Sequence, residues 1–239
     1  MKYAIVTGAT KGIGLGIARM LLDEGYFVTL TYAHDENAAT LCREQLSEWT
    51  GSFEILKVDQ ADKEAMKVFA QAMRMKPSID CLVCNTGTTL RKSLSETTDE
   101  DWERVMQVNV NSNVYLVRDL FDKFSMDSRI IFIGSLMAIR PHATSLAYGV
   151  TKAALHALAL NLVKCFEGTG TTVNAIAPGF VETEWQKDKP QEIRENIYKK
   201  TAIKRFASID EIADAVRFCI RNSFVNGSVI EISGGYSFK

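Results

Sequence analysis

Apolar runs and amphipathic stretches alternate along most of the chain. Short runs rich in β-branched and aromatic residues are typical of strands, and apolar residues at helical spacing are typical of helices. The alternation indicates a parallel sheet with helices on both faces. We therefore expect an α/β protein, a Rossmann-type doubly wound fold with a seven-stranded, mainly parallel sheet. The predicted strands are 3–6, 27–31, 53–58, 80–84, 129–133, 172–176 and 229–232, and the predicted helices are 14–24, 36–49, 63–75, 100–124, 146–166 and 210–220.

The same rhythm continues without an internal repeat, a low-complexity tract or a linker, which indicates a single domain over residues 1–239. A chain of 239 residues can form one large α/β core and needs no second one. The least regular part is 178–204, a polar stretch with a short helix-like piece at 190–200. Because it interrupts the pattern on the side of the sheet that carries ligands, it is a candidate substrate lid.

Composition and charge argue against several classes of function. Hydrophobic residues make up 46% of the chain and charged residues 24%, as in ordinary globular proteins, and the net charge is −1. The Lys and Arg residues are scattered, so we expect no nucleic-acid partner and no attraction to anionic lipid. We expect no membrane span and no signal peptide, since the chain enters a predicted strand at once. A cytoplasmic protein is expected.

The five cysteines indicate a reducing compartment rather than a disulfide framework. Cys81 and Cys84 have the C-x-x-C spacing of redox and metal sites, but they lie in one predicted strand. Side chains three residues apart on a strand point to opposite faces, so these thiols cannot bind one metal ion. We predict two buried, unreactive cysteines and no metal site.

A glycine-rich turn follows the first predicted strand and leads into the first helix. Its spacing, G-x-x-x-G-x-G, differs from the commoner G-x-G-x-x-G fingerprint of dinucleotide sites. Glycines in such a turn let the backbone approach a pyrophosphate, and the helix N-terminus favours the anion. The turn therefore predicts a dinucleotide bound by Gly8, Thr10, Lys11, Gly12, Ile13 and Gly14.

The end of the second strand indicates which dinucleotide is bound. A carboxylate about twenty residues after the glycines would hydrogen-bond an unphosphorylated ribose and repel a 2′-phosphate. Neutral Tyr32 stands there, Asp35 is expected to cap the next helix, and Lys11 adds a positive charge near the ribose. We expect NADP(H) in contact with Lys11 and Tyr32, and NAD(H) as the second choice. A solvated loop cation is the simpler interpretation of Lys11.

Two further strand ends are expected to meet the cofactor, since ligands of a doubly wound sheet lie across the carboxyl ends of its strands. Asp59 and Gln60 follow the third strand, where Asp59 would accept a hydrogen bond from the adenine amino group. Asn85, Thr86 and Gly87 follow the fourth strand, next to the first one. Both sets are predicted to bind the cofactor.

The candidate reaction centre lies between the fifth strand and the helix 146–166. Ser135 follows the strand, and Tyr148 and Lys152 share a helix face because they are four residues apart. A hydroxyl, a phenol and a cation together can transfer a proton. On spacing alone, a core tyrosine and a surface lysine would explain the pattern equally well. The residues expected near the substrate are Arg140, Pro141 and His142, with His142 exposed, while Trp185 packs on either the substrate or the lid.

Six motifs in order along the chain resemble those of the short-chain dehydrogenase/reductase family. The turn 7–14 is similar to its T-G-x-x-x-G-I-G, and Asn85-Thr86-Gly87 to its N-A-G, with Thr86 in place of alanine. Within the family, the chain most resembles the 3-oxoacyl-[acyl-carrier-protein] reductases of fatty acid biosynthesis. The segments that carry this resemblance are 201–206 and 232–236. The other matches are Val108-Asn109-Val110 to the segment with the family's asparagine, Ser135 to its serine, Tyr148 and Lys152 to its Y-x-x-x-K, and Pro178-Gly179-Phe180-Val181-Glu182-Thr183 to its P-G-x-x-x-T.

The resemblance implies an NADPH-dependent enzyme that transfers a hydride to a ketone carbonyl, with a 3-oxoacyl thioester among the candidate substrates. Tyr148 would be the general acid in reduction, and Lys152 would lower its pKa and hold the nicotinamide ribose. Ser135 would hydrogen-bond the carbonyl oxygen, and Asn109 would hold a water that relays protons to Lys152. The nicotinamide carboxamide would be held by Pro178, Gly179, Val181 and Thr183.

The sequence departs from the carrier-protein reductases at positions that bear on its partners. Family members that use the acidic carrier protein have basic helix ends, whereas 122–127 and 167–170 are nearly neutral or acidic, which argues against that partner. An NAD-linked alcohol or sugar dehydrogenase of the same fold stays open, and so does a non-catalytic dinucleotide sensor. A homotetramer is expected, as in the family, because the long helices carry more apolar positions than one sheet face can use. Examples are Leu155, Leu158, Leu160 and Leu162.

Overall fold

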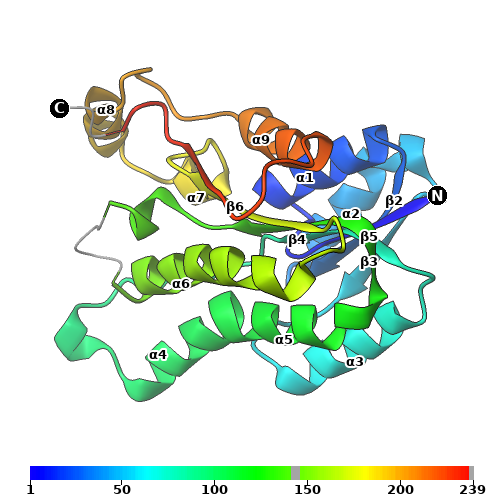
Figure 1. Cartoon of the computed structure of the whole chain (residues 1–239). Coiled ribbons are helices and arrows are strands. Elements are labelled where there is room, and N and C mark those ends of the chain that lie inside the picture. The colour runs from blue at the N-terminus through cyan, green and yellow to red at the C-terminus, as the bar shows by residue number, and fades with distance from the viewer. Residues whose placement is uncertain (141–145, 237–239) are drawn as a thin grey trace.

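The computed structural model describes residues 1–140 and 146–236, and its seven strands form one sheet in the order β3-β2-β1-β4-β5-β6-β7 (Figure 1). Every neighbouring pair of strands is parallel. The predicted doubly wound fold is confirmed, and the sheet is wholly rather than mainly parallel. The strands are β1 (Lys2–Val6), β2 (Tyr26–Tyr32), β3 (Phe53–Lys57), β4 (Ile79–Cys84), β5 (Phe124–Ile133), β6 (Thr172–Pro178) and β7 (Val229–Ile232).

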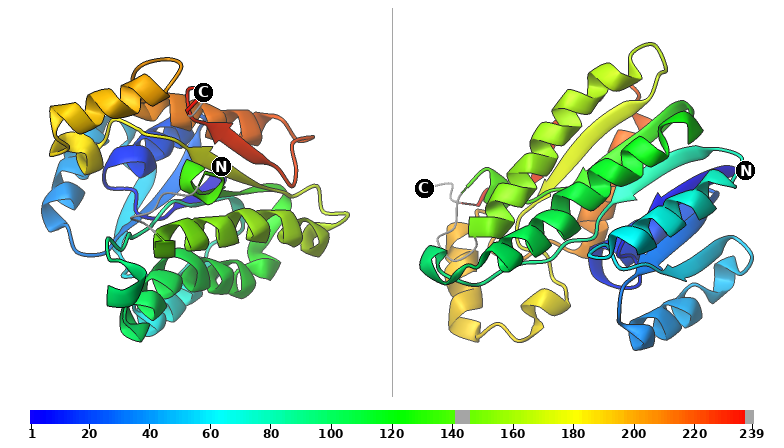
Figure 2. Two further views of the ribbon diagram at one scale, coloured as in Figure 1. Left: turned by 90° about the vertical axis from the view of Figure 1, so that its left-hand side faces the viewer. Right: turned by 90° about the horizontal axis from the view of Figure 1, so that it is seen from below.

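Helices cover both faces of the sheet, as the two further views also show (Figure 2). In Figure 1, α1 and α9 lie above the sheet, and α3, α5 and α6 lie below it. The segment after β6 carries α7 and α8 at the upper left, where the candidate lid was expected. The helices are α1 (Gly12–Asp23), α2 (Glu36–Gln45), α3 (Lys63–Arg74), α4 (Asp99–Met106), α5 (Ser112–Asp119), α6 (Leu146–Leu162), α7 (Glu184–Lys187), α8 (Gln191–Lys200) and α9 (Ile209–Arg221).

Two apolar cores, one on each face, hold these layers together. Above the sheet, Ile17 of α1 and Ile212 of α9 pack with residues of the inner strands. Below it, Phe69 of α3 and Leu155 of α6 form the second core. Burying one such side chain contributes about 1.5–3 kcal/mol, so each helix is fixed mainly by its apolar face. Cys81 belongs to the first core and Cys84 to the second, which confirms that the two thiols point to opposite faces.

Several helices begin at the residues that their sequence indicates. Asp35 caps α2 by accepting a hydrogen bond from the Ala38 amide, and Asp62 caps α3 in the same way. Thr98 opens α4 and Ser208 opens α9 with a capping box. Such caps satisfy amide groups that a helix leaves without a partner at its start.

One predicted helix has different boundaries in the structure. The region expected to be helical at 100–124 consists of α4, a π-helical turn (Gln107–Asn111), α5 and a 3₁₀ turn (Phe121–Lys123). Phe124 pairs with Ile79 of β4, so β5 begins earlier than expected. The short apolar run around Phe124 fits either a helix or a strand, and pairing with β4 decides between them.

The helix Leu146–Phe166, which is α6 with its terminal 3₁₀ turn, corrects a second expectation. By length and composition, its 21 residues could cross a membrane, whereas no such segment was expected from the sequence. In the fold this helix packs on the sheet, with Leu155 fully buried and Leu158 and Leu162 partly buried. Leu160 is 50% exposed. Its apolar character therefore comes from a face that packs on the core together with apolar residues that stay exposed.

Candidate active site

A cavity of about 890 Å³ lies at the carboxyl ends of the strands. The strand order reverses between β1 and β4, and ligands of open α/β sheets bind at such a point. The predicted residues that line the cavity are Gly8, Thr10, Lys11, Gly12, Ile13, Gly14, Tyr32, Asn85, Thr86, Gly87, Ser135, Tyr148, Lys152, Pro178, Gly179, Val181 and Thr183. Residues far apart in the sequence therefore meet where the motifs indicated.

The glycine turn after β1 has the backbone that its sequence requires. Gly8 and Gly12 have φ values of 61° and 58°, in the left-handed region that favours glycine. A side chain on Gly14 would collide with the Gly8 carbonyl and would lie 2.6 Å from Nδ2 of Asn85. Asn85 holds the turn by donating to the carbonyls of Thr7 and Gly8, at 2.9 Å and 2.8 Å.

The turn leads into α1, whose N-terminus has no side-chain cap. Amides at the start of a helix favour an anion through their hydrogens and the helix dipole. The uncapped terminus lies at the cavity, since Gly12, Ile13 and Gly14 line it. The turn and this terminus therefore fit the pyrophosphate of a dinucleotide.

The outer end of the cavity carries charges that the sequence showed only in part. Nζ of Lys11 lies 2.6 Å from a carboxylate oxygen of Asp35 and 3.4 Å from one of Glu184. Asp35 caps α2 as predicted, and it also binds Lys11. Lys11 and Asp35 are about half exposed, so this ion pair is readily exchanged for another partner. Glu184, which comes from α7, was not indicated by any motif.

The candidate reaction centre joins the end of β5 to the start of α6. The Ser135 side chain lies close enough to the Tyr148 phenol to affect its pKa. Nζ of Lys152 lies 5.6 Å from the centre of the Tyr148 ring and donates to the Ile133 carbonyl at 2.6 Å. The hydroxyl of Ser135 also accepts from the Met137 amide at 3.1 Å, at the start of a 3₁₀ turn. The hydroxyl, phenol and amine predicted from spacing therefore occupy one corner of the cavity.

Burial dominates the protonation behaviour of this centre. Burial raises the pKa of the Tyr148 phenol, while the nearby Ser135 side chain opposes that shift. It lowers the pKa of Lys152 to about 8, because the ammonium group is removed from water. The net direction is opposite to the predicted lowering of the Tyr148 pKa by Lys152, because burial of the phenol is the largest cause.

Asn109 lies beside this centre but does not line the cavity. It sits in the π-helical turn between α4 and α5 and is fully buried. Its side-chain oxygen accepts from the Thr88 amide at 2.8 Å, and its nitrogen donates to the Thr88 carbonyl and to the Thr151 hydroxyl, both at 2.9 Å. It therefore links the loop after β4 to α6. π-Helical turns are frequent at functional sites.

Two predicted cofactor residues lie elsewhere. Gln60 is buried, and its side chain donates to the Ser112 hydroxyl at 2.7 Å, so it supports α5 instead of reaching the cavity. Asp59 does not line the cavity either. One of its oxygens lies 3.2 Å from Nε2 of His34, which does line it. Strand position alone cannot tell a loop residue that faces the ligand from one that turns inward.

Other residues at the site were missed or left open. Trp185 lines the cavity with its ring 6.5 Å from that of Tyr148, so it packs beside the reaction centre. His156 was missed, although it lies one turn after Lys152. Its Nε2 accepts from the Ser135 amide at 3.4 Å, and its ring fills the space that a side chain on Gly134 would need. Arg140 also lines the cavity, whereas Pro141 and His142 lie outside the described residues.

Comparisons with known proteins agree with this architecture. A family model described as enoyl-(acyl carrier protein) reductase matches residues 8–237. The chain is 29% identical to a 3-oxoacyl-[acyl-carrier-protein] reductase of Aquifex aeolicus, over 98% of this chain and 96% of that protein. It is 30% identical to a 2-dehydro-3-deoxy-D-gluconate 5-dehydrogenase of Pseudoalteromonas atlantica, over 98% and 95%.

A solved structure is similar in the same way. It is a short-chain dehydrogenase of Burkholderia cenocepacia in complex with NADP, with a TM-score of 0.90 and 26% identity over 98% of this chain and 96% of that one. Fold, site and comparisons together define an NAD(P)-dependent oxidoreductase. The chain belongs to the short-chain dehydrogenase/reductase family.

Proposed function

We propose that this protein reduces a ketone carbonyl with NADPH, and that Ser135, Tyr148 and Lys152 carry the proton chemistry. The observation that carries the proposal is that these three side chains meet in one cavity. The same cavity is lined by the glycine turn and by the uncapped N-terminus of α1. The bound cofactor would supply the hydride that reaches the carbonyl carbon. The protein must then deliver a proton to the carbonyl oxygen and stabilise the charge that develops there.

Tyr148 is the group that donates this proton. Its raised pKa keeps the phenol protonated at neutral pH, which suits a general acid. Ser135, which lies beside the phenol, donates to the carbonyl oxygen once substrate is bound, where it stabilises negative charge. Lys152 then stabilises the tyrosinate by its positive charge. Asn109 anchors the path by which protons return to Lys152.

The cofactor preference follows from the outer end of the cavity. Neutral Tyr32 ends β2, and Lys11 lies within reach of a 2′-phosphate at the same edge. A solved relative holds NADP. One observation favours the alternative, an NAD-linked dehydrogenase acting on an alcohol or sugar. Asp35 also lines this end and is positioned to accept from an unphosphorylated ribose.

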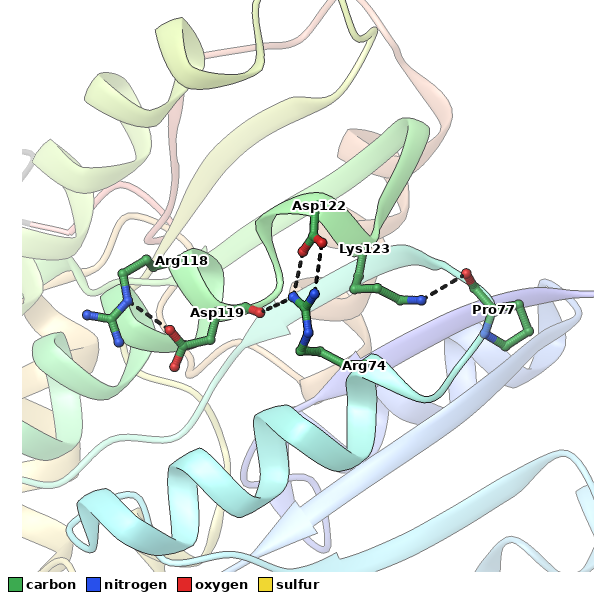
Figure 3. Close-up of polar contacts among 6 residues, drawn as sticks. All are labelled: Arg74, Pro77, Arg118, Asp119, Asp122 and Lys123. Carbon is green, nitrogen blue, oxygen red and sulfur yellow. Dashed lines mark hydrogen bonds and ion pairs between the residues drawn. The ribbon is translucent and has the colours of Figure 1, made fainter.

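The substrate is a small molecule rather than an acyl-carrier protein. A carrier would need free cations at the ends of the long helices, and three cations on α3 and around the end of α5 have partners (Figure 3). Arg74 of α3 makes a double hydrogen bond to Asp122, at 2.5 Å and 2.8 Å. Arg118 binds Asp119 at 2.8 Å, and Lys123 donates to the Pro77 carbonyl at 3.4 Å. This surface is therefore neutralised from within.

The exposed surface of α6 bears on how the protein assembles. Exposed apolar side chains on α6, such as Val150 at 42% and Leu160 at 50%, fit a helix that packs against a second copy. We propose a homotetramer, as in the family, in the cytoplasm. Light scattering at micromolar concentration tests the oligomeric state, and a monomer would contradict the tetramer.

The proposed activity is tested by following NADPH oxidation with a panel of ketones and 3-oxoacyl thioesters. At least one ketone should be reduced, and fluorescence titration should show tighter binding of NADPH than of NADH. Tighter NADH binding, together with oxidation of alcohols, would favour the alternative. Cofactor binding without turnover of any carbonyl or alcohol would indicate a sensor.

A further inference from the structure

The walls of the cavity carry an unbalanced charge on one side. The acidic side chains among its lining residues are Asp35 and Glu184, and both bind Lys11 at the cofactor end. Among the described residues that line the cavity, the cations that remain besides the buried Lys152 are Arg140, Lys199 and Lys200. The whole chain has a net charge of −1, so this excess of positive charge is local.

These cations come from different loops on the same side of the sheet. Arg140 follows β5, and Lys199 and Lys200 lie at the end of α8, in the segment after β6. In the strand order, β5 and β6 lie on one side of β4, whereas β1 and β2, which hold the cofactor turn, lie on the other. Arg140 and the end of α8 therefore follow strands on the side away from the glycine turn, although Glu184, from the same segment as α8, reaches across to Lys11.

A second group of cations lies near Phe180, in another part of the cavity wall. Nζ of Lys189 lies 6.0 Å from the centre of the Phe180 ring, and Phe180 lines the cavity. Burial, together with the positive charges of Arg91 and Arg194, lowers the pKa of Lys189. Arg91 comes from the loop after β4, so the loops after three successive strands each supply cations. Among Lys189, Arg91 and Arg194, Arg194 has an acidic partner, Glu182.

Helix geometry explains only part of this arrangement. Lysines at the end of α8 are favoured by the helix dipole, which would account for Lys199 and Lys200 without any ligand. Arg140 and Arg91 are not on that helix and gain nothing from it. Like charges brought together repel each other, and an arrangement of this kind is stabilised when an anion binds between them.

We propose that the carbonyl substrate carries an anionic group, a carboxylate or a phosphate, which Arg140, Lys199 and Lys200 bind at the mouth of the cavity. This inference rests on the proposed reductase function and names its substrate class. The cations attract the substrate from solution and orient it, so that its ketone faces Tyr148. Electrostatic attraction of this kind raises association rates by about 10–10³-fold and weakens with salt.

The first test compares keto acids with their uncharged esters. The probes are 3-oxobutanoate, 4-oxopentanoate and 5-oxohexanoate, each beside its methyl ester, with NADPH as the reductant. We expect kcat/KM for at least one acid to exceed that of its ester by about tenfold, and this ratio to fall at high salt. Acetoacetyl-CoA and acetoacetyl-N-acetylcysteamine form the corresponding pair for a phosphate. The pair with the larger ratio of kcat/KM for the anionic probe over its neutral counterpart shows whether the site takes a carboxylate or a phosphate.

The second test removes the cations. The double variant Lys199→Met/Lys200→Met and the single variant Arg140→Met should each lower the ratio of anionic to neutral probe. The variant Lys63→Met/Lys67→Met changes the net charge equally on distant α3, and it should leave the ratio unchanged. Tight binding of NADPH must persist in the Lys199/Lys200 variant. A loss of that binding would assign these cations to the cofactor and overturn the proposal.

Binding measured without turnover separates this inference from the proposed function. Titration calorimetry of the NADP⁺-loaded protein with 5-oxohexanoate and its methyl ester should show binding of the acid, and Lys199→Met/Lys200→Met should weaken it. If no ketone is reduced but this binding holds, the reductase function fails and the anion site stands. Equal binding of acid and ester by the wild-type protein overturns the anion site.

Discussion

Nζ of Lys152 donates a hydrogen bond to the carbonyl oxygen of Ile133 across 2.6 Å and so ties α6 to the last residue of β5. Ser135 lies two residues after Ile133, and Tyr148 lies one turn before Lys152. The bond therefore holds the two halves of the reaction centre together. It also keeps the ammonium group out of water, which is costly unless the group loses its proton.

The cost of burying Lys152 predicts how stability changes with pH. Because the pKa is lowered from 10.5 to about 8, the unfolded chain binds more protons than the folded one between these values. The penalty is fully present below pH 8 and disappears as the pH rises toward 10.5. Lys152→Met should therefore raise the free energy of unfolding at pH 7, by on the order of 3 kcal/mol at most.

Urea denaturation of wild type and Lys152→Met at several pH values checks this prediction. The difference between the two proteins should shrink steadily from pH 8 to pH 10.5. A difference that does not change with pH would mean that packing, and not the charge, sets the effect. Activity serves as the control, since the variant should lose turnover.

Tyr148→Phe removes the proposed proton donor and leaves the ring in place. We expect turnover to fall by about 10²–10⁴-fold, the usual contribution of general acid catalysis. NADPH binding, followed by fluorescence, should stay close to that of the wild type. Tyr115→Phe on α5 is the matched control and should retain full activity. A Tyr148→Phe enzyme that keeps most of its turnover would rule out the assignment.

The ion pair between Lys11 and Asp35 predicts opposite effects on the two cofactors. Lys11→Met should weaken NADPH binding by about tenfold, since hydrogen bonds to charged groups contribute about 1.5–3 kcal/mol, and should change NADH binding little. Asp35→Asn frees Lys11 and removes a negative charge, so it should tighten NADPH binding. Titrations of both variants with both cofactors measure this. Equal losses for NADPH and NADH would place Lys11 away from the 2′-phosphate.

Gly14→Ala should damage the cofactor turn specifically. The added methyl group would collide with the Gly8 carbonyl and crowd Asn85, so the turn would have to shift and NADPH binding should fall strongly. Overpacking of this kind costs about 1–3 kcal/mol of stability. Gly25→Ala is the control. Gly25 has a φ of 80°, and the added Cβ would meet nothing within 4 Å. The variant should therefore lose about 1–2 kcal/mol of stability through backbone strain and keep normal cofactor binding.

Much of this molecule could be predicted from the sequence because local patterns decide it. Strand and helix periods gave the fold, and the glycine turn and the spacing of Tyr148 and Lys152 located the cavity. The failures share a physical cause. Gln60 follows a strand in the expected place but turns inward to Ser112, and Phe124 joins β5 because β4 offers a partner. Tertiary contacts made those choices, and no local pattern records them.

The electrostatics of the site were also beyond the sequence. The expectation that Lys152 lowers the pKa of Tyr148 left out burial, which raises the pKa of Tyr148 and lowers that of Lys152. The cations Arg140, Lys199 and Lys200 lie far apart along the chain, and only the fold brings them to one cavity. Charge patterns built from several loops depend on topology rather than on composition.

Asn109 uses its side-chain amide to bind the loop after β4 at Thr88 and the helix α6 at Thr151. The loop that lines the cavity after β4 and the helix that carries the proposed proton donor are thus fastened together in the protein alone. The entropy of aligning them is lost once, during folding, and need not be lost again at each binding event. Substrate would therefore meet a preorganised catalyst, and exchange of the Thr88 amide hydrogen should be slow even without cofactor.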